Sequence, residues 1–253
     1  MPRGWNFYFA RKDGSRRDAA RPGFFASLKM TGDEGRMSGW DSSLRLSNFF
    51  ARKDGRGKDS SVKGENMGKI TVETCEIDGL KVITPAVYGD ARGYFMETYN
   101  YNDFKAAGIR EVFVQDNQSS SARGVLRGLH FQINYPQDKL VRVVKGEVFD
   151  VAVDLRPGSK TYGQWHGVLL SAENKKQFFI PKNFAHGFLV LSDTAEFCYK
   201  CTDFYHPNDE GGLPYNDPEI GVEWPFEEGV ELNLSEKDKK WESFAAYRKA
   251  RGL

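Results

Sequence analysis

The stretch Gly124-Val-Leu-Arg-Gly-Leu-His-Phe-Gln132 reads as a strand that is interrupted by glycine. Gly124 and Gly128 bracket Arg127, and a glycine inside a strand usually marks a bulge or a close approach of a ligand to the backbone. Side chains alternate between the two faces of a strand, so regular geometry would send Arg127 and His130 to opposite faces. If both reach one pocket, a kink at Gly128 must turn one of them around.

Strand-like segments follow one another closely around this stretch. We expect a hairpin-like start over residues 70–84, an aromatic strand over 94–99, and a short helix that is capped by Asn102 and stopped by Gly108. Short strands without intervening helices indicate an all-β antiparallel sandwich or barrel, and a jelly roll fits best. The further predicted strands are Val112–Ser119, Leu126–Phe131, Leu140–Lys145, Val148–Asp154, Gln164–Leu170, Gln177–Ile180, His186–Leu191 and Ala195–Cys201.

The two ends of the chain differ from this β-rich part. Residues 1–66 hold 14 Lys/Arg against 8 Asp/Glu, whereas the remainder holds 22 against 27. We expect residues 1–66 to be a low-complexity, disordered basic extension and residues 67–253 to form one jelly-roll domain. The alternative for the extension is a basic arm for nucleic acid. Residues 238–249 have helical spacing, which predicts a last helix that packs Trp241 and Phe244 against the body.

Composition limits the class of protein. The 253-residue chain has no apolar run near the roughly 20 residues that span a bilayer, so we expect a soluble protein without a membrane partner. We also expect no nucleic-acid partner. Cys75, Cys198 and Cys201 are too few for a disulfide scaffold, which favours a reducing cytoplasm. Cys198 and Cys201 form a CxxC within a predicted strand. Positions three apart there point to opposite faces, which disfavours a redox or zinc site.

The histidines raise the question of a metal. A jelly roll with histidines at such points resembles the cupins, many of which bind a metal through two closely spaced histidines, a carboxylate and a later histidine. Here the residue two after His130 is Gln132, and Lys139 lies where further ligands would be sought. A cation beside His130 would repel a metal, so we expect no metal and no cofactor. The four histidines are His130, His166, His186 and His206.

A histidine, a lysine and a tyrosine in one barrel suit proton transfer beside a carbonyl. The imidazole of His130 can take a proton near neutral pH, the cation of Lys139 can stabilise an enolate oxygen, and the phenol of Tyr199 can return a proton. Each also has a structural interpretation, as a strand histidine, a solvated lysine or a core tyrosine. From the residues alone both interpretations stay open.

Several separate motifs resemble the dTDP-4-dehydrorhamnose 3,5-epimerase family. The similarity runs from about Ile70 to Asp238 and does not extend to residues 1–66. It implies a metal-free cupin, a homodimer, that inverts C3 and C5 of a 4-keto-6-deoxyhexose carried on dTDP in the pathway to dTDP-L-rhamnose. The motifs are Phe113-Val-Gln-Asp-Asn117, Leu126-Arg-Gly-Leu-His-Phe-Gln132, Lys139-Leu-Val-Arg142, Gly146-Glu-Val-Phe-Asp-Val-Ala-Val-Asp154, Phe184-Ala-His-Gly-Phe188 and Leu234-Ser-Glu-Lys-Asp238.

The resemblance implies four catalytic residues. His130 resembles the family's base, and Asp238 resembles the carboxylate that orients it. Lys139 resembles the residue beside the C4 oxygen, where its charge lowers the cost of the enolate. Tyr199 resembles the acid on the opposite face of the sugar.

The resemblance also implies a set of binding residues. Arg127 and His186 match positions that contact the nucleotide-sugar, and Tyr205 matches the aromatic that stacks on thymine. Arg92 and Glu97 match positions that reach the neighbouring subunit's site in the dimer. The remaining polar contacts are Gln115, Asn117, Glu210 and Lys237.

Other functions remain open on the sequence. Shared motifs fix the chemistry better than the number of centres, so a 3- or 5-epimerase or a ketoisomerase is an alternative. Other classes are a sugar-nucleotide-binding cupin without catalysis and a metal-dependent oxygenase or isomerase.

Overall fold

The computed structural model describes residues 65–66 and 69–253. The extension predicted for residues 1–66 falls outside the described residues apart from the strand β1 (Glu65–Asn66). β1 pairs antiparallel with β2 (Ile70–Thr74), so the sheet takes in residues just upstream of position 67. In the part of the chain that the structure describes, no helix is long and apolar enough to cross a bilayer.

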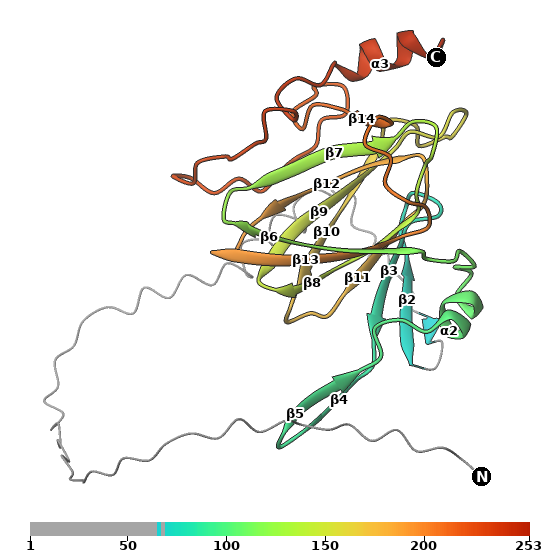
Figure 1. Cartoon of the computed structure of the whole chain (residues 1–253), viewed down its shortest axis with the longest axis vertical. Helices are drawn as coiled ribbons and strands as arrows, with labels where there is room; N and C mark the ends of the chain where they lie inside the picture. Colours follow the sequence, from blue (N-terminus) through green and yellow to red (C-terminus); the bar gives the residue numbers. More distant parts are fainter. Residues whose placement is uncertain (1–64, 67–68) are drawn as a thin grey trace, which may run out of the picture. The chain divides into compact units, whose positions relative to one another are not determined.

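Two antiparallel sheets face each other, as Figure 1 shows, and the predicted jelly-roll fold is confirmed. The larger sheet has the order β1, β2, β3 (Lys81–Pro85), β11 (Gln177–Ile180), β8 (Lys139–Lys145), β13 (Thr194–Cys201) and β6 (Gln115–Ala122). The smaller sheet has the order β10 (Trp165–Ser171), β9 (Glu147–Asp154), β12 (Phe184–Val190), β7 (Leu126–Gln132) and β14 (Glu210–Gly212). A separate hairpin consists of β4 (Val87–Asp90) and β5 (Gly93–Met96).

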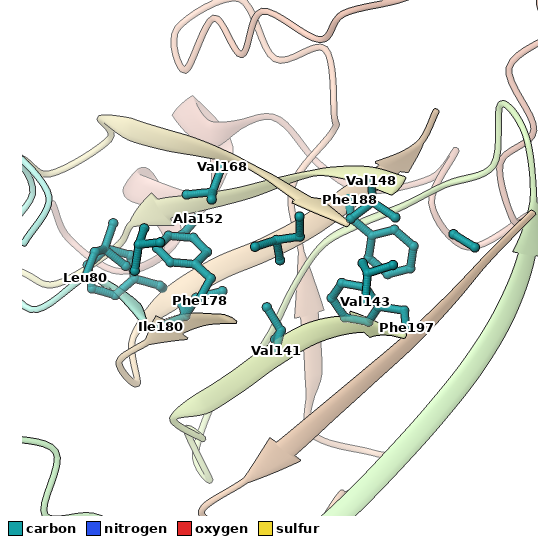
Figure 2. Close-up of a cluster of buried hydrophobic side chains, with 14 of the residues drawn as sticks. Leu80, Val141, Val143, Val148, Ala152, Val168, Phe178, Ile180, Phe188 and Phe197 are labelled. Atoms are coloured by element: carbon teal, nitrogen blue, oxygen red, sulfur yellow. The ribbon is translucent and has the colours of Figure 1, made fainter. Parts of the chain in front are cut away.

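The core lies between the two sheets. Phe178 and Phe197 of the larger sheet meet Phe188 and Val148 of the smaller one, as seen in Figure 2. The outer faces are covered as well, because Trp224 and Phe244 pack on the smaller sheet in a second apolar cluster, and Phe104 and Ile109 pack on the larger sheet in a third. Strands covered on both faces become hydrophobic almost throughout, which explains the continuous burial of β9. The polar cavity described below takes up the remaining space between the sheets.

The two helices differ from their predictions at their starts. α2 (Tyr101–Ala106) is capped by Asn100, not Asn102, because the Asn100 side chain accepts from the backbone N–H of Asn102. α3 spans only Phe244–Ala250 and is capped by Ser243.

The segment that precedes α3 forms hydrogen-bonded turns instead of helix. The Asp238 N–H donates to Ser235 Oγ, and the Lys240 N–H donates to the Lys237 carbonyl three residues back, so the chain turns here without continuing as a helix. The predicted packing of Trp241 and Phe244 on the body is confirmed. Trp241 lies against Gly212 of β14, and Phe244 is buried.

β6 begins three residues later than the strand predicted at Val112–Ser119. The prediction followed the apolar residues Val112 and Val114, but both are exposed and precede the strand. β6 is instead an edge strand of polar sequence that pairs with β13 along its whole length. Its alternate residues face the cavity, so their polarity reflects the site and not solvent exposure.

Gly128 provides the kink that the sequence demanded. Its φ is +131°, and the pairing of β7 with β12 shifts register between His186 and Phe188, opposite this point. Arg127 and His130 consequently line one cavity although they stand three apart in the same strand. The backbones approach closely here, since a Cβ on Gly128 would lie 2.5 Å from the Cα of Gly187.

Gly128→Ala is expected to lower the free energy of unfolding by about 1–3 kcal/mol more than Gly93→Ala does. Gly93 has a nearly identical φ of +132°, but a Cβ there would meet nothing within 4 Å. Both variants therefore suffer the same backbone strain, and only Gly128→Ala also has the clash. Urea unfolding of both variants measures the difference, and equal losses would contradict the close approach.

Candidate active site

A cavity of about 660 Å³ opens between the sheets. A second hollow of about 230 Å³ adjoins it and shares His130, Lys139, Tyr199, Tyr205 and Glu210 with it. This size is in the range of small-molecule sites. The residues predicted from the sequence that line the larger cavity are Arg127, His130, Lys139, His186, Tyr199, Tyr205, Glu210, Lys237 and Asp238. Gln115 and Asn117 of β6 line the adjoining hollow.

His130 and Asp238 form a hydrogen-bonded pair on one wall. The Nε2 of His130 contacts Asp238 Oδ1, and Ser235 and Trp241 also donate to the same carboxylate at 2.8 and 3.3 Å. Burial alone would raise the pKa of Asp238, but the bonds from His130, Ser235 and Trp241 outweigh it and lower the pKa. Asp238 therefore stays a carboxylate, and His130 Nε2 carries the hydrogen. That leaves Nδ1 as the nitrogen that can take a proton.

The turn that carries Asp238 is held in place by the start of β7. Asn233 forms an isolated parallel bridge with Val125, the residue that precedes β7. The backbone of Asn233 also exchanges hydrogen bonds with Gly124 and Leu126. His130 and Asp238 lie 108 residues apart in sequence but are joined by this connection.

Lys139 and Tyr199 stand on the opposite sheet, on β8 and β13. Burial lowers the pKa of Lys139 although Cys201, Asp150 and Glu210 act to raise it. Lys139 is half-buried and lines both hollows. Burial also raises the pKa of Tyr199, so its phenol keeps its proton at neutral pH.

His186 belongs to a second histidine–carboxylate pair that the sequence did not reveal. Its Nε2 contacts Asp150 Oδ2 at 2.9 Å, and Asp150 is fully buried on the neighbouring strand β9. Burial lowers the pKa of His186 and raises that of Asp150. Asp150 was missed because it sits within the apolar run Val148–Val153 of β9, where the only signal was one charged residue in the interior of a buried strand.

A polar cluster stands at the mouth of the cavity around Glu210. Glu210 Oε2 accepts from Lys237 Nζ at 2.6 Å and from Tyr205 OH at 3.2 Å. The backbone N–H of Tyr205 donates to Gln115 Oε1, which fixes the loop over the cavity. Gln132 holds the same loop through the backbone of His206, a positioning role that the sequence did not indicate.

Arg127 reaches across to the larger sheet, where its Nε donates to Ser121 Oγ of β6 at 3.1 Å. Arg92 and Glu97, by contrast, line neither hollow of their own chain. Arg92 pairs with Asp90 at the tip of the β4–β5 hairpin, and Glu97 accepts from Lys69 at 2.8 Å.

No cluster of three or more His, Cys, Asp or Glu residues suited to a metal ion occurs within residues 65–66 and 69–253. The three cysteines are unpaired. Burial raises the pKa of both Cys198 and Cys201, which disfavours the reactive thiolate form.

A proton acceptor and a proton donor thus stand on opposite sheets with the cavity between them. A histidine on one side of the cavity could exchange a substrate proton with water. Inversion of a carbon centre also needs a proton donor on the opposite face of the substrate. Fold and site together therefore define a cupin-type epimerase, an isomerase that works by proton transfer.

Comparison with known proteins gives the family. The model of the dTDP-4-dehydrorhamnose 3,5-epimerase family matches residues 74–246, and the chain belongs to this family. The dTDP-4-dehydrorhamnose 3,5-epimerase of Methanothermobacter thermautotrophicus is 59% identical over 165 residues, which are 65% of this chain and 89% of the relative. The Escherichia coli enzyme of the same name is 54% identical over 167 residues, 65% of this chain and 89% of the relative.

Solved structures agree with this assignment. An epimerase from Legionella pneumophila in complex with dTDP-4-keto-L-rhamnose superposes with a TM-score of 0.65 at 54% identity, over 67% of this chain and 90% of that one. A 3'-monoepimerase from Streptomyces bikiniensis in complex with dTDP-quinovose gives a TM-score of 0.65 at 32% identity, over 71% and 90%. The expected fold and family are confirmed by these comparisons.

Proposed function

We propose that this protein inverts C3 and C5 of dTDP-4-dehydro-6-deoxy-D-glucose to give dTDP-4-dehydro-L-rhamnose, in dTDP-L-rhamnose biosynthesis. The observation that carries the proposal is the placement of His130 and Tyr199 on opposite sheets that face one cavity. The identity of 54–59% to named 3,5-epimerases favours two centres over the single centre of the Streptomyces bikiniensis relative, which is 32% identical.

The chemistry follows from where charge develops. His130 Nδ1 removes the proton next to the C4 ketone, and negative charge builds on the ketone oxygen. The ammonium of Lys139, in a cavity that shields it from bulk water, stabilises that enolate oxygen. Tyr199 then delivers its phenol proton to the opposite face of the same carbon, which inverts the centre.

The nucleotide part of the substrate is bound nearer the mouth in this proposal. The planar guanidinium of Arg127 can bond two pyrophosphate oxygens at once. His186 adds a contact to the nucleotide-sugar from its pair with Asp150. Tyr205 offers an aromatic face to thymine, and Gln115 and Asn117 offer polar contacts.

Solvent deuterium tests the reaction. In D₂O the protein should incorporate deuterium at both C3 and C5 of dTDP-4-dehydro-6-deoxy-D-glucose while the product forms. Mass spectrometry and NMR locate the label. Deuterium at one carbon alone would replace the proposal with a single-centre epimerase, and binding without any label would leave a sugar-nucleotide-binding cupin.

A homodimer is part of this proposal because the β4–β5 hairpin exposes large apolar side chains. Phe95 is 68% exposed, and Val87, Tyr88 and Tyr94 are exposed on the same hairpin. In the described part of the chain its two strands pair only with each other, away from the main sheets (Figure 1). Such a patch marks an interaction surface, and we assign it to a second copy, whose cavity Arg92 and Glu97 then reach.

The three unpaired cysteines favour the cytoplasm as the compartment.

Mixing two inactive variants tests the shared site. Coexpressed Arg92→Ala and His130→Ala subunits should recover about a quarter of wild-type activity at low substrate, since half of the dimers are mixed and each has one intact site. The control pairs His130→Ala with Lys139→Met. Both of those residues come from the same subunit, so no site is restored. Equal activity of the two mixtures would refute the contribution of Arg92 to its neighbour.

A further inference from the structure

Two inversions in one cavity create a proton problem, given the proposed function. Each inversion leaves His130 as an imidazolium, because it has taken the substrate proton, and leaves Tyr199 as a phenolate. The second inversion requires a neutral imidazole and a protonated phenol again. An enzyme that inverts two centres of one bound sugar therefore needs a route by which the proton leaves His130.

Glu210 stands beside the nitrogen that receives the proton. Asp238 occupies Nε2 of His130, and Glu210 Oε1 lies 3.9 Å from Nδ1. An unprotonated Nδ1 and a carboxylate oxygen both present lone pairs, so they do not bond in the resting state. Once Nδ1 carries a proton, it becomes a charged donor facing a carboxylate, and a small movement of the Glu210 side chain closes the gap.

The other oxygen of Glu210 connects to the surface. Oε2 accepts from the Tyr205 hydroxyl and from the Lys237 ammonium. The Glu210 side chain is 15% exposed and the Lys237 side chain 47%, so two short steps lead from His130 to water.

We propose that Glu210 is the proton exit of this site and resets His130 between the two inversions. The Nδ1–H bond of the imidazolium breaks and an O–H bond forms on Glu210 Oε1, which gives a neutral imidazole and a carboxylic acid. The carboxylic acid then releases its proton to water at the mouth. Water supplies the proton that the Tyr199 phenolate takes up, so no net proton is gained or lost.

Glu210→Gln tests this exit in the full-length protein. Glutamine keeps the size of glutamate and can still accept from Tyr205 and Lys237. It cannot, however, take a proton from His130 and release it to water. With dTDP-4-dehydro-6-deoxy-D-glucose in D₂O, the rate of the first inversion is the internal reference, because a loss of binding at Glu210 would affect both inversions. The second should slow about 100-fold, so that sugar labelled at one carbon accumulates. Added formate should restore the second inversion, because a small acid can replace the missing carboxylate.

Glu236→Gln is the matched control. It makes the same substitution in the same segment as Lys237, at an exposed residue that pairs with Lys239. It should label both carbons at the wild-type rate. If Glu210→Gln slows both inversions equally, or if formate leaves the labelling ratio unchanged, Glu210 is a binding residue only and the exit is refuted. Wild-type protein that labels fewer than two carbons would instead refute the proposed function, whatever the variant does.

Discussion

Replacing His130 with alanine is expected to lower kcat by about 10²–10⁴-fold and to abolish deuterium incorporation at both C3 and C5. The reason is that one base, His130, serves both centres in the proposed mechanism. Its Nδ1 is the free nitrogen because Asp238 holds Nε2. Rates measured by NMR in D₂O report the loss at each carbon separately. Label persisting at either carbon would mean that a second base exists.

Two companion variants separate this loss from misfolding. His166→Gln removes a half-buried histidine that lines neither hollow, and it should leave the labelling rate unchanged. Tyr199→Phe keeps the ring but removes the acid, so it should impair inversion more than deuterium exchange. Equal loss of exchange and inversion in Tyr199→Phe would contradict its role as the proton donor.

The strands could be predicted because their patterns are local. β9 is buried from Val148 to Asp154 and β12 along its whole length, and such mostly apolar runs bounded by turns are visible in the sequence. β6 was misplaced because its polar residues face a cavity, and a cavity wall looks like a solvent-exposed surface in sequence. β14 was missed because three residues, Glu210–Gly212, carry too little pattern.

The site could be predicted only in part for a related reason. The kink at Gly128 was readable, since two glycines around an arginine are a local signal. The side chains that lie beside His130 and His186 from other strands could not be paired with them in this way. Asp150 pairs with His186 from a neighbouring strand, and Glu210 reaches His130 from β14, the strand beside β7. Such pairings depend on sheet order and loop placement, which no single segment of sequence encodes.

Lys139→Met is expected to lower kcat by about 10²–10³-fold, the usual cost of removing one donor from a developing oxyanion. Methionine is similar in length and apolar, so it fits the buried part of the site without a charge. Because the ammonium acts where charge appears in the transition state, KM should change little. Initial rates across substrate concentrations separate the two constants, and a raised KM with unchanged kcat would make Lys139 a binding residue.

The pH dependence distinguishes Lys139 from a lysine in water. Burial lowers its pKa below the ordinary 10.5, so activity that needs the ammonium falls as the pH rises through the lowered value. The unfolded chain still holds this proton up to its ordinary pKa. Lys139 therefore makes folding stability rise with pH across the same window, because the unfolded state binds more protons there.

Activity should thus fall with rising pH while the free energy of unfolding of the wild type rises relative to that of Lys139→Met, a difference that isolates the contribution of Lys139. Tyr199 does not cause the fall, since burial raises its pKa and keeps the phenol protonated longer. The rate and the urea unfolding free energy measured from pH 7 upward test this pairing. The alkaline fall should vanish from the residual activity of Lys139→Met. A fall that persists there, or that coincides with unfolding, would remove the ammonium from the mechanism.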